Sequence, residues 1–328
     1  MKEDQRQRSS YHHKPTLFSY PAAFIVLILL SYALGYLSAS YCLYPRSIES
    51  SPPPITVTKT IREEAEARAK TPSLGPTKSR STDLRSQLDN FQITTRCANP
   101  LPPELIRQTI LDRIFNGTSP YVDFPPPHVS TLLRSKRIKG WGSYNAVFKD
   151  LIQRVKPRTI IEVGTFLGAS ALHMAELTRE LGLQTQILCV DDFRGWPSFR
   201  DKVKDIRMVN GDVLLLYQFM QNVIHLNSTG YVLPVPFSSG SALEALCEWG
   251  VLGDLIEIDA GHDFQSAWAD INRAYRMLRP GGVIFGDDYF TSVDNRGVRR
   301  AVNLFAQING LKVRAHGRHW VIDSAKLS

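Results

Sequence analysis

Short apolar runs alternate with longer amphipathic segments over the last half of this chain, and this alternation constrains the fold more than any other feature. Runs typical of buried strands lie at 159–163, 186–190, 232–235, 255–258, 282–285, 311–314 and 319–322, and expected helices lie at 102–115, 144–155, 169–181, 212–225, 240–249, 265–278 and 296–308. Strands separated by helices of ten or more residues pair in parallel through right-handed crossovers. We therefore predict an α/β fold with a doubly wound, mostly parallel, Rossmann-like sheet of seven strands.

An uncharged stretch near the N-terminus predicts a membrane anchor. No charged residue occurs over 15–45, and the centre of this stretch, 22–34, is strongly apolar. About 20 apolar residues in a helix span the hydrocarbon core of a bilayer. Basic residues are more frequent before the stretch than after it, so we expect a cytosolic tail over 1–16 and a transmembrane signal anchor over 17–44. A cleaved signal peptide and a buried helix are the alternatives.

Composition divides the rest of the chain into a stem and a globular body. Residues 45–98 are rich in Pro, Ser, Thr and charge, which predicts a flexible stem, and residues 99–328 read as one globular domain. Of the formal net charge of +8, five charges belong to residues 1–100, so the body is nearly neutral. This balance argues against a nucleic-acid partner.

Cysteines and glycosylation sequons bear on the compartment. Four cysteines are too few for a disulfide scaffold, and they lack the spacing of a zinc site. Cys189 and Cys247 lie in apolar runs and are expected to be inert core residues, which leaves Cys97 as the candidate for an interchain bridge. Asn116 and Asn227 begin sequons that suit a lumenal body, although a chain with this many asparagines carries one or two by chance.

The glycines after the first predicted strand are the first candidate for a ligand site, because ligands of such sheets bind beyond the carboxyl ends of the strands. Gly164 and Gly168 frame the turn that opens the next helix, whose free N–H groups suit an anionic or polar ligand. A purely steric need for a tight turn is the alternative. Phe166 breaks the dinucleotide pattern GxGxxG, which disfavours a nicotinamide-dependent enzyme.

Acidic residues follow three of the predicted strands. Asp191 and Asp192 end the second and suit the two hydroxyls of a ribose, or they serve as a cap or a loop carboxylate. Asp259 ends the fourth strand, and Asp287 and Asp288 end the fifth. Neighbouring strands lie about 4.8 Å apart, so these carboxylates can converge on one hard cation such as Mg²⁺. Capping of the helices that follow is the alternative for Asp259 and Asp288.

Two segments resemble a known enzyme class. Residues 162–170, together with 191–192, resemble the S-adenosylmethionine (SAM) site of class I methyltransferases. Residues 258–289 resemble the metal-dependent sugar O-methyltransferases of antibiotic biosynthesis and the cephalosporin-hydroxylase-like proteins. The resemblance covers about 140–328, and the anchor and stem resemble those of plant Golgi-type proteins that carry such a domain.

The resemblance implies a role for each matching residue. The methionine end of SAM would contact Glu162, Gly164 and Gly168, its ribose would contact Asp191 or Asp192, and Mg²⁺ would be held by Asp259, Asp287 and Asp288. The sugar enzymes carry a proposed general base two residues after the first metal ligand, where this chain has Gly261. His262 is the nearest replacement, and its ordinary pKa suits proton abstraction near neutral pH. A capping or core histidine is the alternative.

These implications lead to one expected function and one alternative. We expect SAM-dependent O-methylation of a hydroxyl on a small-molecule or glycan acceptor, assisted by Mg²⁺, in the Golgi lumen of a single-pass type II membrane protein. The sequence does not decide whether the protein forms a homo-oligomer. The departure at Gly261 keeps a membrane-anchored, non-catalytic methyltransferase-like scaffold as the alternative. The segment 139–143 is expected to be a lid over the cofactor or a plain loop.

Overall fold

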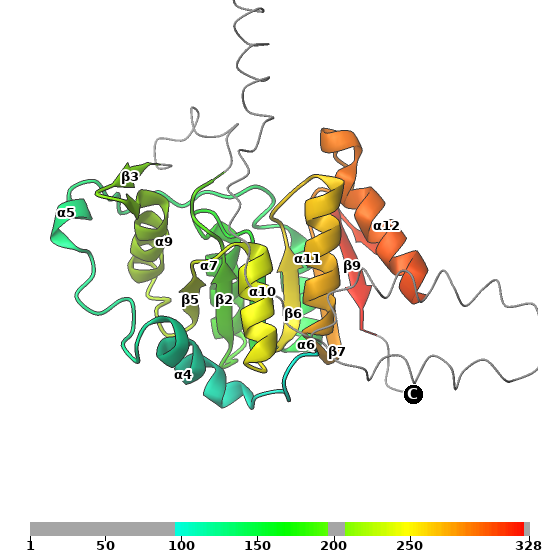
Figure 1. Cartoon of the computed structure of the whole chain (residues 1–328), viewed down its shortest axis with the longest axis horizontal. Helices are drawn as coiled ribbons and strands as arrows, with labels where there is room; N and C mark the ends of the chain where they lie inside the picture. The colour runs from blue at the N-terminus through cyan, green and yellow to red at the C-terminus, as the bar shows by residue number, and fades with distance from the viewer. Residues whose placement is uncertain (1–95, 196–206, 325–328) are drawn as a thin grey trace, which may run out of the picture. The chain divides into compact units, whose positions relative to one another are not determined.

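The computed structural model describes residues 96–195 and 207–324, which belong to one compact unit of the chain (Figure 1). The predicted tail (1–16), the predicted anchor (17–44) and nearly all of the predicted stem (45–98) lie outside the described residues. Among the helices that the structure describes, none combines the length and the apolar character that crossing a membrane requires.

A seven-stranded sheet forms the centre of the unit. Its strands are β1 (Thr159–Val163), β2 (Gln186–Val190), β5 (Val232–Val235), β6 (Gly253–Ile258), β7 (Leu278–Gly286), β8 (Arg314–His316) and β9 (His319–Asp323). They lie in the order β5-β2-β1-β6-β7-β9-β8, and β9 runs antiparallel to both of its neighbours. The predicted Rossmann-like, mostly parallel sheet of seven strands is therefore confirmed. Its order reverses between β1 and β6, which is where ligands of such sheets bind.

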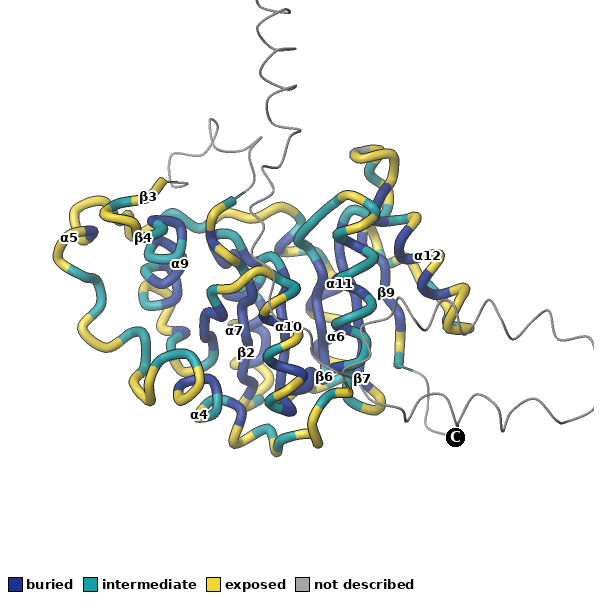
Figure 2. The backbone as a smooth tube through the Cα atoms, in the orientation of Figure 1, coloured by how far each residue is buried: buried dark blue, intermediate teal, exposed yellow. Residues whose placement is uncertain are grey.

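Helices cover both faces of the sheet and enclose two apolar cores. One face carries α6 (Ala146–Val155), α7 (Ala169–Glu180) and α9 (Leu214–His225), and the other carries α4 (Pro103–Ile114), α10 (Ser239–Glu248), α11 (Phe264–Arg276) and α12 (Gly297–Asn309). In Figure 1, α10, α11 and α12 lie in front of the sheet. Figure 2 shows that the central strands are buried almost throughout, which explains why their sequences are apolar without alternation.

Short elements account for the differences from the predicted boundaries. A hairpin of β3 (Met208–Val209) and β4 (Asp212–Val213) takes the first two residues of the helix expected at 212–225. The structure also contains the one-turn helix α5 (Pro127–Ser130) and the short 3₁₀ helix η1 (Val293–Asn295). The strand expected at 311–314 begins only at Arg314. Elements of two to four residues carry too little periodicity to be recognised in a sequence.

A disulfide between Cys97 and Cys247 corrects the expectations for both cysteines. Cys97 does not serve an interchain bridge, and Cys247 is not an inert core thiol, because the segment before α4 lies along the end of α10. The N–H of Ala98 donates to the carbonyl of Cys247 over 2.9 Å, and the N–H of Leu101 donates to the carbonyl of Gly250 over 2.8 Å. Cys189 is buried and free, as expected.

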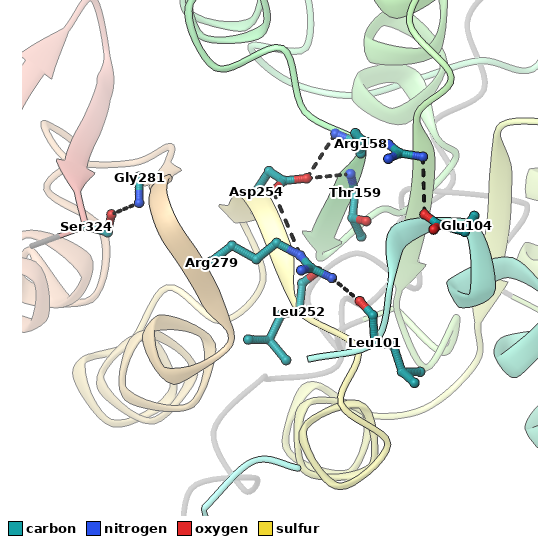
Figure 3. A network of polar contacts seen from close by, with 9 residues as sticks. All are labelled: Leu101, Glu104, Arg158, Thr159, Leu252, Asp254, Arg279, Gly281 and Ser324. Carbon is teal, nitrogen blue, oxygen red and sulfur yellow. Dashed lines mark hydrogen bonds and ion pairs between the residues drawn. The ribbon is translucent and has the colours of Figure 1, made fainter. Parts of the chain in front are cut away.

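A polar network fastens the amino ends of the strands (Figure 3). The carboxylate of Asp254 accepts the backbone N–H groups of Arg158 and Thr159, each over 2.9 Å. The guanidinium of Arg279 donates to the carbonyl of Leu101 and so ties the N-terminal segment to β7. This network lies at the edge of the sheet opposite to the strand-end acids, so it stabilises the fold away from the candidate site.

Candidate active site at the carboxyl edge of the sheet

The glycine turn after β1 packs directly against the segment after β6. Gly164 has a φ of +92°, and a Cβ there would lie 2.1 Å from the carbonyl oxygen of Asp259. A Cβ at Gly168, whose φ is +81°, would lie 2.8 Å from the ring of Phe219. The N–H of Asp259 also donates to the carbonyl of Val163 over 2.8 Å. Glycine is thus required at both positions by close packing, and this packing brings the turn beside the first strand-end acid.

Glu162 supports the turn from within the sheet. Its side chain is fully buried, and its carboxylate accepts hydrogen bonds from the hydroxyls of Thr165 and Ser170. In the sheet register it lies beside Glu257 of β6. Burial raises the pKa of both glutamates, and the charge of Glu162 raises the pKa of Glu257 further. The predicted cofactor residue Glu162 therefore shapes the turn and the start of α7.

The two acids after β2 differ in what they bind. The carboxylate of Asp191 accepts three backbone N–H groups, from Thr165 over 3.1 Å, from Phe166 over 2.9 Å and from Phe193 over 2.7 Å. Asp191 therefore ties β2 to the glycine turn. Asp192 is exposed, and one of its oxygens accepts the N–H of Arg194 over 2.9 Å. Of the two predicted ribose residues, Asp192 has the more accessible carboxylate.

A cavity of about 300 Å³ opens beside the start of α7. It is lined by Ile138, Lys139, Gly140, Trp141, Tyr144 and Ala169. The ring of Trp141 lies 5.6 Å from that of Phe166 in the glycine turn. No side chain of the described residues caps the first N–H groups of α7, so these donors are available to a ligand. The volume is at the lower end of the range of small-molecule sites.

The predicted lid segment 139–143 crosses from this cavity to the end of β7. A Cβ at Gly140 would lie 2.8 Å from the Cβ of Ala169, and a Cβ at Gly142 would lie 2.8 Å from Oδ2 of Asp287. The Cβ at Gly142 would also lie 3.6 Å from Cδ of Arg318. One short segment thus touches both the cofactor side and the acidic side, so the two belong to a single site.

Three side chains gather at the ends of β6 and β7. One ligand atom from each of Asp259, His262 and Asp288 lies within 4.8 Å of the other two. Nε2 of His262 is 3.0 Å from Oδ2 of Asp288. They line a cavity of about 10 Å³, the size of one water molecule or ion, together with Trp320, whose buried Nε1 has no hydrogen-bond partner among the described residues.

Asp287 faces a different partner. Nε of Arg318, on the turn between β8 and β9, donates to Oδ1 of Asp287 over 2.6 Å. A second nitrogen of Arg318 lies 3.5 Å from Oδ1 of Asp288. Of the three predicted metal ligands, the structure brings Asp259 and Asp288 together with His262, whereas the buried carboxylate of Asp287 is paired with Arg318. Sequence reasoning missed Arg318, because nothing in its local sequence marks it.

The capping alternative for the strand-end acids does not hold. The N-cap of α11 is Asp263, which accepts the N–H groups of Gln265 and Ser266. The residue at the N-cap of α12 is Arg296, and no side chain caps that helix. Asp259 and Asp288 are therefore available for other partners.

Electrostatics in the cluster favour a bound cation. Burial, with the charges of Asp287 and Asp288 in addition, raises the pKa of Asp259 to about 7. The hydrogen bond between His262 and Asp288 lowers the pKa of Asp288 and raises that of His262. Like charges at such distances resist joint ionisation unless a proton or a metal ion compensates them. Two carboxylates and one imidazole fit a divalent ion such as Mg²⁺ or Mn²⁺.

Position 261 cannot hold the acidic base that the sugar O-methyltransferase pattern places there. A Cβ at Gly261 would lie 2.4 Å from Cβ of Ser266 in the first turn of α11. Any larger residue would push this turn away from its capping residue. The departure at Gly261 is thus built into the packing of the loop, and His262 is the neighbouring group that can exchange a proton.

Strained backbone marks the same edge of the sheet. Phe166, Phe193 and Asp288 have φ values of +49°, +54° and +59°, and each lies just after a different strand. Non-glycine residues adopt such angles rarely and at a cost, which is typical of functional sites.

Comparison with known proteins gave one family match and several similar solved structures. Residues 161–289 match a protein family that is described as a methyltransferase domain. Among solved structures, a putative O-methyltransferase from Klebsiella pneumoniae is 21% identical, with 62% of this chain and 92% of that chain covered and a TM-score of 0.42. The O-methyltransferase from Bacillus cereus in complex with S-adenosylhomocysteine (SAH) is 19% identical, with 67% and 97% covered and a TM-score of 0.42. The comparison with curated proteins gave no match.

The family match spans the structural parts that matter for the cofactor. It begins within β1, includes the glycine turn and the acids after β2, and ends just after Asp288. The strand order reverses at this turn, which is where ligands of such sheets bind. Residues 161–289 are therefore similar to a methyltransferase domain, and this match supports a SAM-dependent methyltransferase.

Proposed function

We propose that this chain is an O-methyltransferase that transfers the methyl group of SAM to a hydroxyl of a sugar or polysaccharide, assisted by a divalent cation. One observation carries the proposal: the segment 139–143 joins the cavity at the start of α7 to the cluster of Asp259, His262 and Asp288. A methyl donor and an acidic cluster that can activate a hydroxyl then lie on two sides of one site.

The residues around the larger cavity suit SAM. The free N–H groups of α7 suit a carboxylate, the exposed Asp192 suits the ribose hydroxyls, and Trp141 offers an aromatic face. The sulfonium of SAM supplies an electrophilic methyl group. The chain contributes mainly orientation, because methyl transfer needs the acceptor oxygen in line with the donor.

The acidic cluster suits activation of the acceptor hydroxyl. Asp259 and Asp288 would hold Mg²⁺, which lowers the pKa of a bound hydroxyl. His262 then acts either as the third ligand or as the group that takes the proton, with Asp288 orienting its ring. The two roles are distinguished by the metal dependence of a His262→Gln variant: loss of a ligand weakens Mg²⁺ binding, whereas loss of a base slows turnover at saturating Mg²⁺.

Calorimetric titration of the full-length chain with SAH tests the cofactor part of the proposal. We expect binding, and we expect Asp192→Asn to weaken it about tenfold through loss of a charge-assisted hydrogen bond. Glu180→Gln, an exposed acid at the far end of α7, is the matched control and should bind as the parent does. Absence of heat with the parent chain refutes the proposed activity and leaves the non-catalytic scaffold.

The same proposal places the catalytic domain in the Golgi lumen of a single-pass type II membrane protein. The disulfide Cys97–Cys247 supports an oxidising compartment, and the sequon residues Asn116 and Asn227 are both exposed. Glycosidase treatment of the chain from microsomes of the cells that express it should increase its electrophoretic mobility, and Asn116→Gln with Asn227→Gln should abolish that increase. An unshifted parent chain contradicts the lumenal placement.

A further inference from the structure

An arginine stacked on two aromatic rings borders the acidic cluster. Tyr289 and Phe290 directly follow Asp288, and Arg299 belongs to the first turn of α12. This turn abuts the cluster, since a Cβ at Gly297 would lie 2.5 Å from the carbonyl oxygen of His262. We call Tyr289, Phe290 and Arg299 the ledge. It lies beside the predicted site of hydroxyl activation.

Ring contacts and a hydrogen bond hold the ledge in place, and Phe290 stays exposed. Cζ of Arg299 lies 5.2 Å from the ring centroid of Tyr289 and 5.9 Å from that of Phe290, and the two rings meet edge to face at 5.1 Å. The hydroxyl of Tyr289 donates to Asn303 over 2.7 Å, which orients its ring. Phe290 is 55% exposed. These contacts arrange the guanidinium and an aromatic face before any ligand arrives.

Arg299 differs from Arg318 in having no acidic partner among the described residues. Arg318 is paired with Asp287 and lies near Asp288. Within residues 96–195 and 207–324, no carboxylate forms an ion pair with Arg299, whose guanidinium packs on two aromatic rings instead. A half-buried guanidinium that packs on aromatic rings and has no counter-ion among the described residues suits an external carboxylate, which a guanidinium can bind through two parallel hydrogen bonds.

We propose that the ledge is an acceptor subsite that binds a uronic acid unit of the glycan, with Arg299 on its carboxylate and Phe290 against a face of the sugar ring. The C–H groups of a pyranose face carry partial positive charge and suit the negative face of an aromatic ring. The inference rests on the proposed O-methylation of a glycan and adds the class of sugar. It requires the carboxylate to stay at the ledge while a hydroxyl reaches Asp259 and Asp288.

The test compares two acceptors that differ only in their carboxylates. One is a uronic acid oligosaccharide, and the other is the same oligosaccharide after reduction of its carboxylates to primary alcohols. Affinities are measured by calorimetry on the full-length chain with saturating SAH and Mg²⁺. We expect the parent chain to bind the acidic form about tenfold more tightly, and Arg299→Gln to remove this difference.

Matched variants separate the subsite from folding. Arg113→Gln removes an arginine that also stacks on an aromatic ring, that of Trp249 at 5.9 Å, far from the strand-end acids, and should keep the preference. Phe290→Ala should weaken both oligosaccharides. Each variant is first checked for SAH binding and for an unchanged midpoint of urea unfolding, and Arg299→Lys replaces Arg299→Gln if that variant fails this check.

The outcomes distinguish the ledge from the wider proposal. If the parent chain binds SAH but not the acidic form preferentially, or if Arg299→Gln keeps the preference, the ledge proposal is wrong and O-methylation stands. Tighter binding of a sugar phosphate than of the uronic acid form also overturns it. If SAH does not bind at all, the methyltransferase proposal fails, and the carboxylate preference alone then decides whether the ledge binds acidic glycans.

Discussion

Removal of the disulfide between Cys97 and Cys247 should destabilise the domain substantially. The two cysteines are separated by 150 residues in the sequence, so the bond closes a large loop of the unfolded chain. In the chain-entropy treatment a loop of this size lowers the unfolded-state entropy by about 17 cal/mol/K, or about 5 kcal/mol at 25 °C. Measured losses are often smaller than this limit, so we expect Cys97→Ser to lower the free energy of unfolding by about 3–5 kcal/mol.

Urea unfolding followed by circular dichroism measures this effect. The double variant Cys97→Ser/Cys247→Ser should be about as unstable as either single variant, because all three lack the same bond. Cys42→Ser, which removes a cysteine outside the described residues, is the control and should leave the midpoint unchanged. Because Cys97 and Cys247 are joined, the denatured parent chain should show no more than two free thiols in place of four. Four free thiols, or a loss below about 1 kcal/mol, would falsify the reasoning.

Three further predictions concern the site itself. Gly164→Ala should lower the free energy of unfolding by more than about 3 kcal/mol, because a Cβ there meets backbone at 2.1 Å, whereas Gly182→Ala, with open space around it, should cost about 1 kcal/mol in a urea titration. In the folded state the pKa of Asp259 is raised to about 7, so above pH 4 the folded chain binds more protons than the unfolded chain. The free energy of unfolding should therefore fall as pH rises from about 4 to 7, and Asp259→Asn should flatten this dependence. Arg318→Gln leaves the buried carboxylate of Asp287 without its cation and should lower the free energy of unfolding by about 1–2 kcal/mol, a small value because Arg318 is half exposed. Mg²⁺ should restore more stability to this variant than it adds to the parent chain. An equal response of both chains to Mg²⁺ contradicts the assignment.

Much of the fold could be predicted because the central strands are buried on both faces. Their sequences are continuous apolar runs, and the helices between them impose parallel pairing. The position of β9 between β7 and β8 could not be predicted, since pairing of the last two short strands depends on tertiary contacts. The Cys97–Cys247 bond was missed for the same reason: residues 150 positions apart meet only after α10 and the N-terminal segment have packed together.

The candidate site also contains features that could be predicted from the sequence and features that could not. That Asp259 and Asp288 lie close together follows from the topology, because both end neighbouring parallel strands. The orientation of Asp287 does not follow, since it depends on Arg318, which reaches the cluster from a turn 31 residues further along the chain. The bracing role of Asp191 was also hidden, because a strand-end acid that accepts three N–H groups has the same sequence as one that contacts a ribose.

The position of the segment 139–143 has a consequence for how the two substrates bind. Gly140 packs on the start of α7, and Gly142 packs on Asp287 and beside Arg318, so a displacement of one end is transmitted over two residues to the other. Ligation at the acidic cluster and occupancy of the cofactor cavity should then be energetically coupled. Because such coupling is reciprocal, any factor by which Mg²⁺ tightens SAH binding must equal the factor by which SAH tightens Mg²⁺ binding. Two calorimetric titrations, each in the presence of the other ligand, measure this heterotropic cooperativity, and Gly142→Ala should change it in both directions by the same amount.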